Sequence, residues 1–177
     1  VTFNYDREYG SITVDGTATA SGTVKEIPLS GAALVATPLN GGKFLGWVNA
    51  ADGYILSTGT SYTVEPTADM TVKAVFVGAN SKPPFMVGDM TSKSFSYGLF
   101  GLQKATYWTV PSGTHLFDDL NAAAAISAGK AIVLMNDGTL PAGDYTIPAN
   151  ATLLIPFDDA NTLYKDKAQG KPYDDNT

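Results

Sequence analysis

Short segments that alternate apolar and polar residues with a period of two fill the first 77 residues. They are rich in β-branched and aromatic residues and lie at 1–5, 11–14, 23–27, 33–37, 43–49, 54–56, 61–65 and 71–77. Turn-forming pairs such as Asp15-Gly16 and Asp52-Gly53 separate them. A period of two places successive side chains on opposite faces of a strand, and no helical period precedes residue 78. This half of the chain is therefore restricted to a β-sheet fold.

Two of these segments carry large apolar side chains. Phe44 and Trp47 lie in the segment 43–49, and Ala74 and Phe76 share one face of the segment 71–77. Buried aromatic rings supply much of the apolar area that a small sheet needs. Gly46 would let a backbone or a ring pass close by. We therefore expect Phe44 and Trp47 to pack in the core against Ala74 and Phe76.

The pattern changes after this β-rich domain, which we place at residues 1–77. Residues 78–84 contain turn formers and two prolines, as in a short, stiff linker. A second β-rich domain is predicted at 85–164. The polar stretch 165–177 contains few residues able to form a core, so it is predicted to be a disordered tail.

The second domain is predicted to contain one helix near residues 116–128. Its apolar positions and alanines have helical spacing, Ser112 or Thr114 would cap its start, and Gly129 would follow its end. Short apolar or alternating segments predict extended strands at 95–97, 105–110, 131–135, 143–147 and 151–155. The fold class is therefore mainly β or α+β.

Composition excludes some function classes. The net charge is -6 and Arg7 is the sole arginine, which argues against a nucleic-acid or phosphate groove. No apolar run approaches the roughly 20 residues of a spanning helix, so we expect no membrane insertion in this segment. Because the chain starts within a strand pattern and lacks sorting signals, we expect it to be a fragment of a longer protein.

Residues 1–77 resemble the divergent internalin B-type repeat of bacterial surface proteins. The strands at 1–5 and 11–14 match that pattern, as do three later segments and the Phe44-Leu45-Gly46-Trp47 sequence. The resemblance implies a small β-grasp-like sheet. It also implies an extracellular place on the bacterial cell surface, with other domains of the same large surface protein as partners.

The second segment, from about 115 to 157, is similar to the start of right-handed parallel β-helices. In such proteins an amphipathic helix covers the open end of a coil of short strands. Here the helix would be that cap, and the strands at 130–135, 145–147 and 152–155 would form the first turn. Because a coil buries its core only when several turns stack, a smaller compact α+β domain is the alternative.

Polar residues give no convergent catalytic set. Ser112, His115 and Asp118 lie within one short stretch, whereas triads are assembled from distant segments, so capping of the predicted helix is the simpler interpretation. Adjacent acids such as Asp118-Asp119 and Asp158-Asp159 do not face each other across a cleft as glycosidase acids do. We therefore predict no catalytic residues, no cofactor and no metal site.

Aromatic residues supply the candidate contact surface. Rings with polar edges bind sugars, and the candidates are Trp47, Tyr54, Tyr62, Tyr107 and Trp108. Trp47 is assigned to the core. Tyr107 and Trp108 are adjacent, so one of them points outward from a strand. We therefore predict Trp108 and Tyr107 as the ligand contact, with Trp108 the first to test.

Lysines within predicted strands raise the question of isopeptide crosslinks. Lys43, Lys73 and Lys130 occupy such positions. A crosslink needs a buried lysine, an acid or amide partner and a catalytic carboxylate, whereas most strand lysines project into solvent. The sequence leaves both alternatives open.

Two functions follow from these observations. The first is a non-enzymatic structural or adhesive module of a secreted bacterial cell-surface protein, which contacts a host or cell-wall glycan or protein. The alternative is a carbohydrate-binding module, or an accessory segment of a polysaccharide lyase-like enzyme. An active lyase would need basic and metal-binding residues on further coils.

Overall fold

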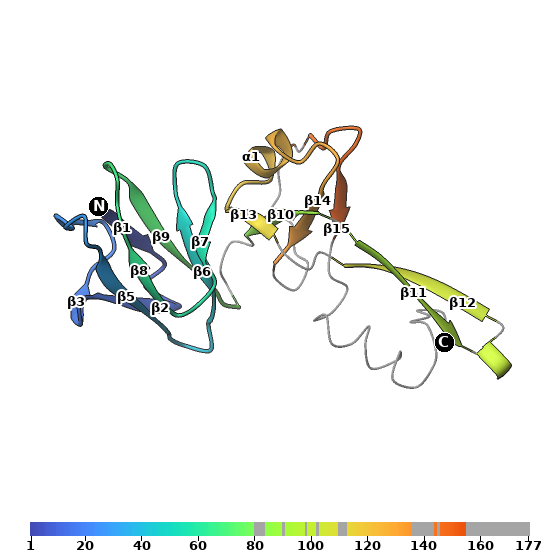
Figure 1. The fold of residues 1–177 in the computed structure, drawn as a ribbon, viewed down its shortest axis with the longest axis horizontal. Helices are drawn as coiled ribbons and strands as arrows, with labels where there is room; N and C mark the ends of the chain where they lie inside the picture. Colours follow the sequence, from blue (N-terminus) through green and yellow to red (C-terminus); the bar gives the residue numbers. More distant parts are fainter. Residues whose placement is uncertain are drawn as a thin grey trace. The chain divides into compact units, whose positions relative to one another are not determined.

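The computed structural model describes residues 1–79, 84–89, 91–97, 99–101, 103–109, 113–135, 144 and 146–154. The chain divides into two compact units. The first unit contains Val1–Lys82 together with Thr114–Asp118, and the second contains Pro83–Gly113 and Asp119–Thr177. Strands dominate and one short α-helix is present among the described residues, so the predicted mainly β class is confirmed (Figure 1).

The first unit consists of two β-sheets, where the sequence predicts one. The larger sheet has the order β4-β1-β9-β6-β7. Its strands are β1 (Thr2–Tyr5), β4 (Thr23–Val24), β6 (Lys43–Asn49), β7 (Ile55–Ser57) and β9 (Thr71–Val77). The smaller sheet has the order β3-β2-β5-β8. Its strands are β2 (Gly10–Val14), β3 (Thr17–Thr19), β5 (Ala32–Pro38) and β8 (Ser61–Val64).

The inner faces of these two sheets share one core. Strand alternation turns every second residue inward, and the buried cluster draws on both sheets. Its members are Phe3, Tyr9, Ile12, Val14, Ala32, Leu34, Ala36, Trp47, Val64, Val72, Ala74 and Phe76. The second sheet therefore covers the apolar face that the first sheet could not bury alone.

A β-bulge in β6 puts Phe44 and Trp47 on the same face. Residues three apart point to opposite faces of a regular strand. Phe44 pairs with Phe76 and Gly46 with Val75, so one extra residue, Leu45, lies between two consecutive positions of β9. The bulge changes the alternation and brings both rings to the core. The predicted packing is confirmed: the Phe44 ring centroid lies 5.4 Å from that of Trp47 and 5.3 Å from that of Phe76.

Two glycines make this packing possible. A Cβ on Gly46 would lie 3.0 Å from the Ser57 carbonyl oxygen, which confirms the close backbone approach predicted there. A Cβ on Gly10 would lie 2.3 Å from the Phe76 ring. At both positions a larger residue would meet neighbouring atoms. Neither glycine has a positive φ, so the backbone conformation itself does not require glycine.

Replacing Gly10 with alanine is expected to lower the free energy of unfolding by about 1–3 kcal/mol, as overpacking of a filled core does. The Phe76 ring would have to move, yet it already contacts Phe44. Urea denaturation followed by circular dichroism measures the change. Ser11→Ala, at the half-buried neighbouring position of the same strand, is the control. Equal midpoints for the two variants would contradict the close contact.

The second unit contains a short mixed sheet, a two-stranded ribbon and one helix. In the sheet, β14 (Ala131–Leu134) pairs antiparallel with β10 (Phe85–Gly88) and parallel with β15 (Thr152–Leu154). The ribbon joins β11 (Thr91–Tyr97) to β12 (Gln103–Thr109) through the 3-10 turn η1 (Leu99–Gly101). The helix α1 (Leu120–Ala125) contacts β10. The strand β13 (Gly113–Phe117) starts in this unit, but Thr114–Asp118 belongs to the first unit.

The helix is shorter than the 116–128 that the sequence predicts. Leu116 and Phe117 lie in β13, where the backbone N–H of Leu116 donates to the Gly53 carbonyl oxygen at 2.8 Å. This contact holds the segment extended, since tertiary context overrides helix propensity. Asp119, not Ser112 or Thr114, is the N-cap, and its side chain accepts from the Asn121 N–H.

The predicted end of the helix also differs. The C-cap is Ile126, and Gly129 adopts a left-handed φ of 73° in the following turn. The N–H of Gly129 donates to the Asn150 carbonyl oxygen at 3.0 Å. Gly129 thus shapes the connection toward β14 and does not cap the helix.

The arrangement does not support the predicted β-helix. The pairing of Ala131 with Thr152 is parallel, as a coil requires, but the neighbour of β14 on its other edge is antiparallel. Thr146 and Ile147, within a predicted strand, are not in a strand. The described residues therefore form a small mixed sheet and not stacked turns. The polar tail at 165–177 lies outside the described residues, as do positions 80–83 of the predicted linker.

Candidate contact surface

Trp47 belongs to the core, as predicted, and not to a ligand-binding surface. Its side chain is fully buried, and its indole Nε1–H donates to the Gly59 carbonyl oxygen at 3.0 Å. Tyr62 is half-buried and packs against the same core. Burial, followed by the nearby charge of Glu65, raises the pKa of Tyr62. Two of the five candidate aromatics thus serve packing.

Tyr54 is the candidate aromatic that the structure places at the surface, and the residue is 49% exposed. It lies in the first unit beside β13. The ring centroids of Tyr54 and His115 are 5.6 Å apart in an edge-on arrangement, and His115 stacks on Phe117 with centroids 6.1 Å apart. We call Tyr54, His115 and Phe117 the aromatic row. Sequence spacing gave no signal for it, because its members come from two distant segments.

A tight turn positions the aromatic row. Asp52 accepts from the Tyr54 N–H at 3.0 Å, and Gly53 has a φ of 74°, which favours glycine. A Cβ on Gly53 would also lie 2.7 Å from the Phe117 ring. The predicted Asp52-Gly53 turn is therefore confirmed, and it holds Tyr54 opposite His115, with which it forms an isolated bridge.

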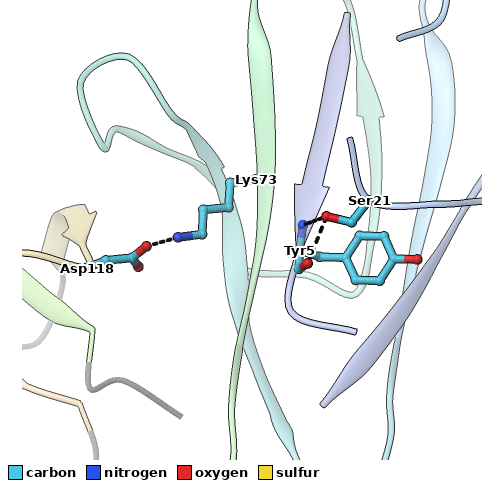
Figure 2. A network of polar contacts seen from close by, with 4 residues as sticks. All are labelled: Tyr5, Ser21, Lys73 and Asp118. Atoms are coloured by element: carbon cyan, nitrogen blue, oxygen red, sulfur yellow. Dashed lines mark hydrogen bonds and ion pairs between the residues drawn. The ribbon is translucent and has the colours of Figure 1, made fainter. Parts of the chain in front are cut away.

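His115 and Asp118 do not act on each other as triad members do. His115 Nδ1 lies 2.8 Å from the Thr114 hydroxyl oxygen, and the Asp118 carboxylate pairs with the Lys73 ammonium. Figure 2 shows the Lys73 and Asp118 side chains pointing toward each other. Ser112 lies outside the described residues. These side-chain contacts of His115 and Asp118 are therefore to different residues, Thr114 and Lys73.

The Lys73–Asp118 pair is open to solvent. The exposed fractions are 28% for Lys73 and 55% for Asp118, so water screens their attraction. An isopeptide bond needs a buried lysine, which Lys73 is not. Lys43 is exposed and Lys130 half-buried. The contact is therefore an ordinary surface ion pair, worth about 0–1 kcal/mol.

The predicted contact residues Tyr107 and Trp108 lie in β12. Tyr107 pairs with Lys93 and Trp108 with Ser92 of the antiparallel partner strand β11. Their side chains lie outside the part of the chain that the structure describes, so the sequence-based expectation that one of them points outward is not tested. Their role as ligand contacts stays a prediction.

One hollow of the first unit, of about 320 Å³, is open to solvent. Its charged lining residues are Lys25, Glu26 and Asp69, and the rest of its lining includes Val1, Val24 and Leu29. No cluster of three or more potential metal ligands occurs within the described part of the chain. Among the same residues, no helix has the length and apolar content needed to cross a membrane.

Comparison with known proteins gives one match. No curated protein and no solved structure matches the chain significantly. Residues 2–80, which include both sheets of the first unit, match the family model described as the divergent InlB B-repeat domain. The match begins at β1 and ends just after β9, and thus covers one complete packing module. The first unit is therefore similar to this family of bacterial repeat domains.

Proposed function

We propose that the chain is a non-catalytic structural segment of a secreted bacterial cell-surface protein, in which the first unit serves as a spacer or adhesive repeat. The observation that carries the proposal is the match of residues 2–80 to a bacterial repeat family. Its partners would be the neighbouring domains of the same protein. A host or cell-wall glycan or protein would bind elsewhere on the assembly or on an exposed face.

The packing of the first unit supports this role. Its large side chains are used in the core, with Phe3 and Trp47 fully buried. Charged residues such as Glu8, Glu65 and Lys43 are instead exposed to solvent. A module of this kind would supply a stable body of defined length between other domains.

Limited protease treatment of intact source cells tests the location. Peptides from the exposed turns of residues 1–79 should be released from intact cells and identified by mass spectrometry. A cytoplasmic protein of the same cells, which should yield no peptides, serves as the control. If peptides of this chain appear only after cell lysis, the surface assignment is wrong.

A carbohydrate-binding role is the second candidate, and the exposed Tyr54 ring favours it. Amphipathic rings at a surface can stack on the apolar face of a sugar. A glycan array with the whole chain tests it, with Tyr54→Ala and Trp108→Ala as separate variants. Phe100→Ala, at an aromatic residue that is 88% exposed, is the matched control. Specific binding that either variant abolishes and the control retains would favour this second function over a spacer.

A further inference from the structure

The first and last strands of the first unit are neighbours and run in the same direction. β1 and β9 form a parallel ladder in which Thr2 pairs with Thr71 and Tyr5 with Ala74. The chain enters the unit at the Thr2 end of this ladder. It leaves β9 at Val77, beyond the opposite end. Neighbouring domains would pull on the start of β1 and on the end of β9. These two points lie at opposite ends of the same ladder.

The other edge of β1 is also held. Phe3 pairs with Thr23 of β4, and the N–H of Lys25 donates to the Val1 carbonyl oxygen at 2.9 Å. At the far end of the strand, the Tyr5 N–H donates to the Ser21 hydroxyl, which donates back to the Tyr5 carbonyl oxygen, both at 2.9 Å (Figure 2). β1 thus has partners on both edges along its whole length.

A side-chain anchor adds to these backbone contacts. Phe3 lies in the middle of β1 and is fully buried in the core between the sheets. Sliding β1 along β9 would pull the Phe3 ring out of the core. The same movement would break the hydrogen bonds on both edges of β1. Exposing a phenylalanine side chain to water is unfavourable, and this cost falls on the same step.

We propose that the first unit is a force-bearing clamp whose resistance to extension resides in β1. Tension between residues 1 and 77 loads the β1–β9 ladder in shear, because the strands are parallel and the pull is along them. The four paired positions must then give way together. Tension applied at one end of the ladder would instead open it one pair at a time. This proposal deepens the structural role proposed above and rests on it for its biological meaning.

Pulling the molecule in two directions tests the clamp. The sequence contains no cysteine, so handles attach only where a cysteine is introduced. In the first variant one cysteine precedes Val1 and the other replaces the exposed Ala79, which gives shear. In the second, Asp69→Cys replaces the Ala79 handle. Asp69 is exposed and immediately precedes the Met70 carbonyl oxygen that bonds the Thr2 N–H, so this pull opens the same ladder from one end.

The whole chain is used, with the second unit attached but outside the path of the force. We expect a rupture force several-fold higher in the shear geometry than in the opening geometry at the same pulling speed. Forced unfolding reports the unfolding rate and not the equilibrium stability, so equal stabilities of the two handle variants should be checked by urea denaturation. Equal rupture forces in the two geometries would overturn the proposal.

Ser21→Ala tests the contribution of the second edge. It removes both hydrogen bonds that the hydroxyl makes to Tyr5, while the small side chain keeps its place. We expect a lower rupture force in shear than for Ser61→Ala, whose hydroxyl lies on an exposed strand position of the other sheet. No difference between these two serine variants would show that the hydrogen bonds of Ser21 to Tyr5 do not contribute to the resistance of β1.

The outcome is separable from that of the proposed function. Protease treatment of intact cells reports where the protein is, whereas the pulling experiment uses purified protein. A strong clamp in a protein absent from the cell surface would refute the location and leave the mechanics standing. A weak clamp in a surface protein would refute the mechanics alone.

Discussion

Replacing Trp47 with alanine is expected to lower the free energy of unfolding of the first unit by about 3–5 kcal/mol, the usual cost of truncating a large buried aromatic. The side chain is fully buried and touches Phe44, with ring centroids 5.4 Å apart. The Gly59 carbonyl oxygen would also lose the indole N–H that it now accepts at 3.0 Å. Urea denaturation followed by circular dichroism measures the loss.

Leu29→Ala is the control for Trp47. Leu29 lies in the same unit but is 80% exposed, so its truncation should change stability by less than about 0.5 kcal/mol. The loss of stability for Trp47→Phe should lie between those for Trp47→Ala and Leu29→Ala, because phenylalanine keeps a ring in the core but cannot make the hydrogen bond to Gly59. If the Trp47→Ala transition overlies that of Leu29→Ala, Trp47 is not a core residue and the two-sheet packing is wrong.

Replacing Phe85 with alanine is the corresponding change in the second unit, and we expect a loss of about 3–5 kcal/mol there. Phe85 is 1% exposed and pairs across β10 and β14 with the fully buried Leu134. Phe100→Ala makes the same chemical change at an 88% exposed position of the same unit. Hydrogen exchange of the β14 amides reports the local loss of stability.

This second change should leave the core of the first unit intact. That core cluster contains no residue of the second unit. Fluorescence of Trp47 in a Trp108→Phe background reports on the first unit alone, since these two are the tryptophans of the chain. We expect its transition midpoint to be the same with and without Phe85→Ala. A joint shift of both units would mean that they unfold as one.

Sequence patterns predict the strands of the first unit well where local alternation and turn residues agree. The segments 43–49 and 71–77 coincide with β6 and β9. The bulge at Leu45 could not be predicted in this way, because it depends on the partner strand and on the close approach of Ser57 to Gly46. Local alternation also cannot divide strands between two sheets, since both sheets use the same period.

The second unit shows where local signals fail. The apolar spacing at Leu116 and Leu120 favours a helix, but the hydrogen bond from Leu116 to Gly53 makes its first part a strand. That partner lies more than 60 positions earlier in the sequence. The aromatic row could not be predicted for the same reason, because Tyr54 and His115 meet only through the fold. Trp47 could be assigned correctly to the core, because its place in the Phe44-Leu45-Gly46-Trp47 segment of the repeat-like pattern indicated a packing role.

Hydrogen exchange of the intact chain tests the central claim most directly. This claim is that β1 lies between β4 and β9 and is hydrogen-bonded on both edges within the two-sheet first unit. Amides in hydrogen-bonded core strands exchange only when the structure opens, whereas those in exposed turns exchange quickly. We predict that the N–H groups of Phe3 and Tyr5 in β1 are protected to the same degree as those of Val72 and Ala74 in β9. Exchange of the β1 amides as fast as that of the exposed turn at Gly41, with β9 still protected, would contradict the account.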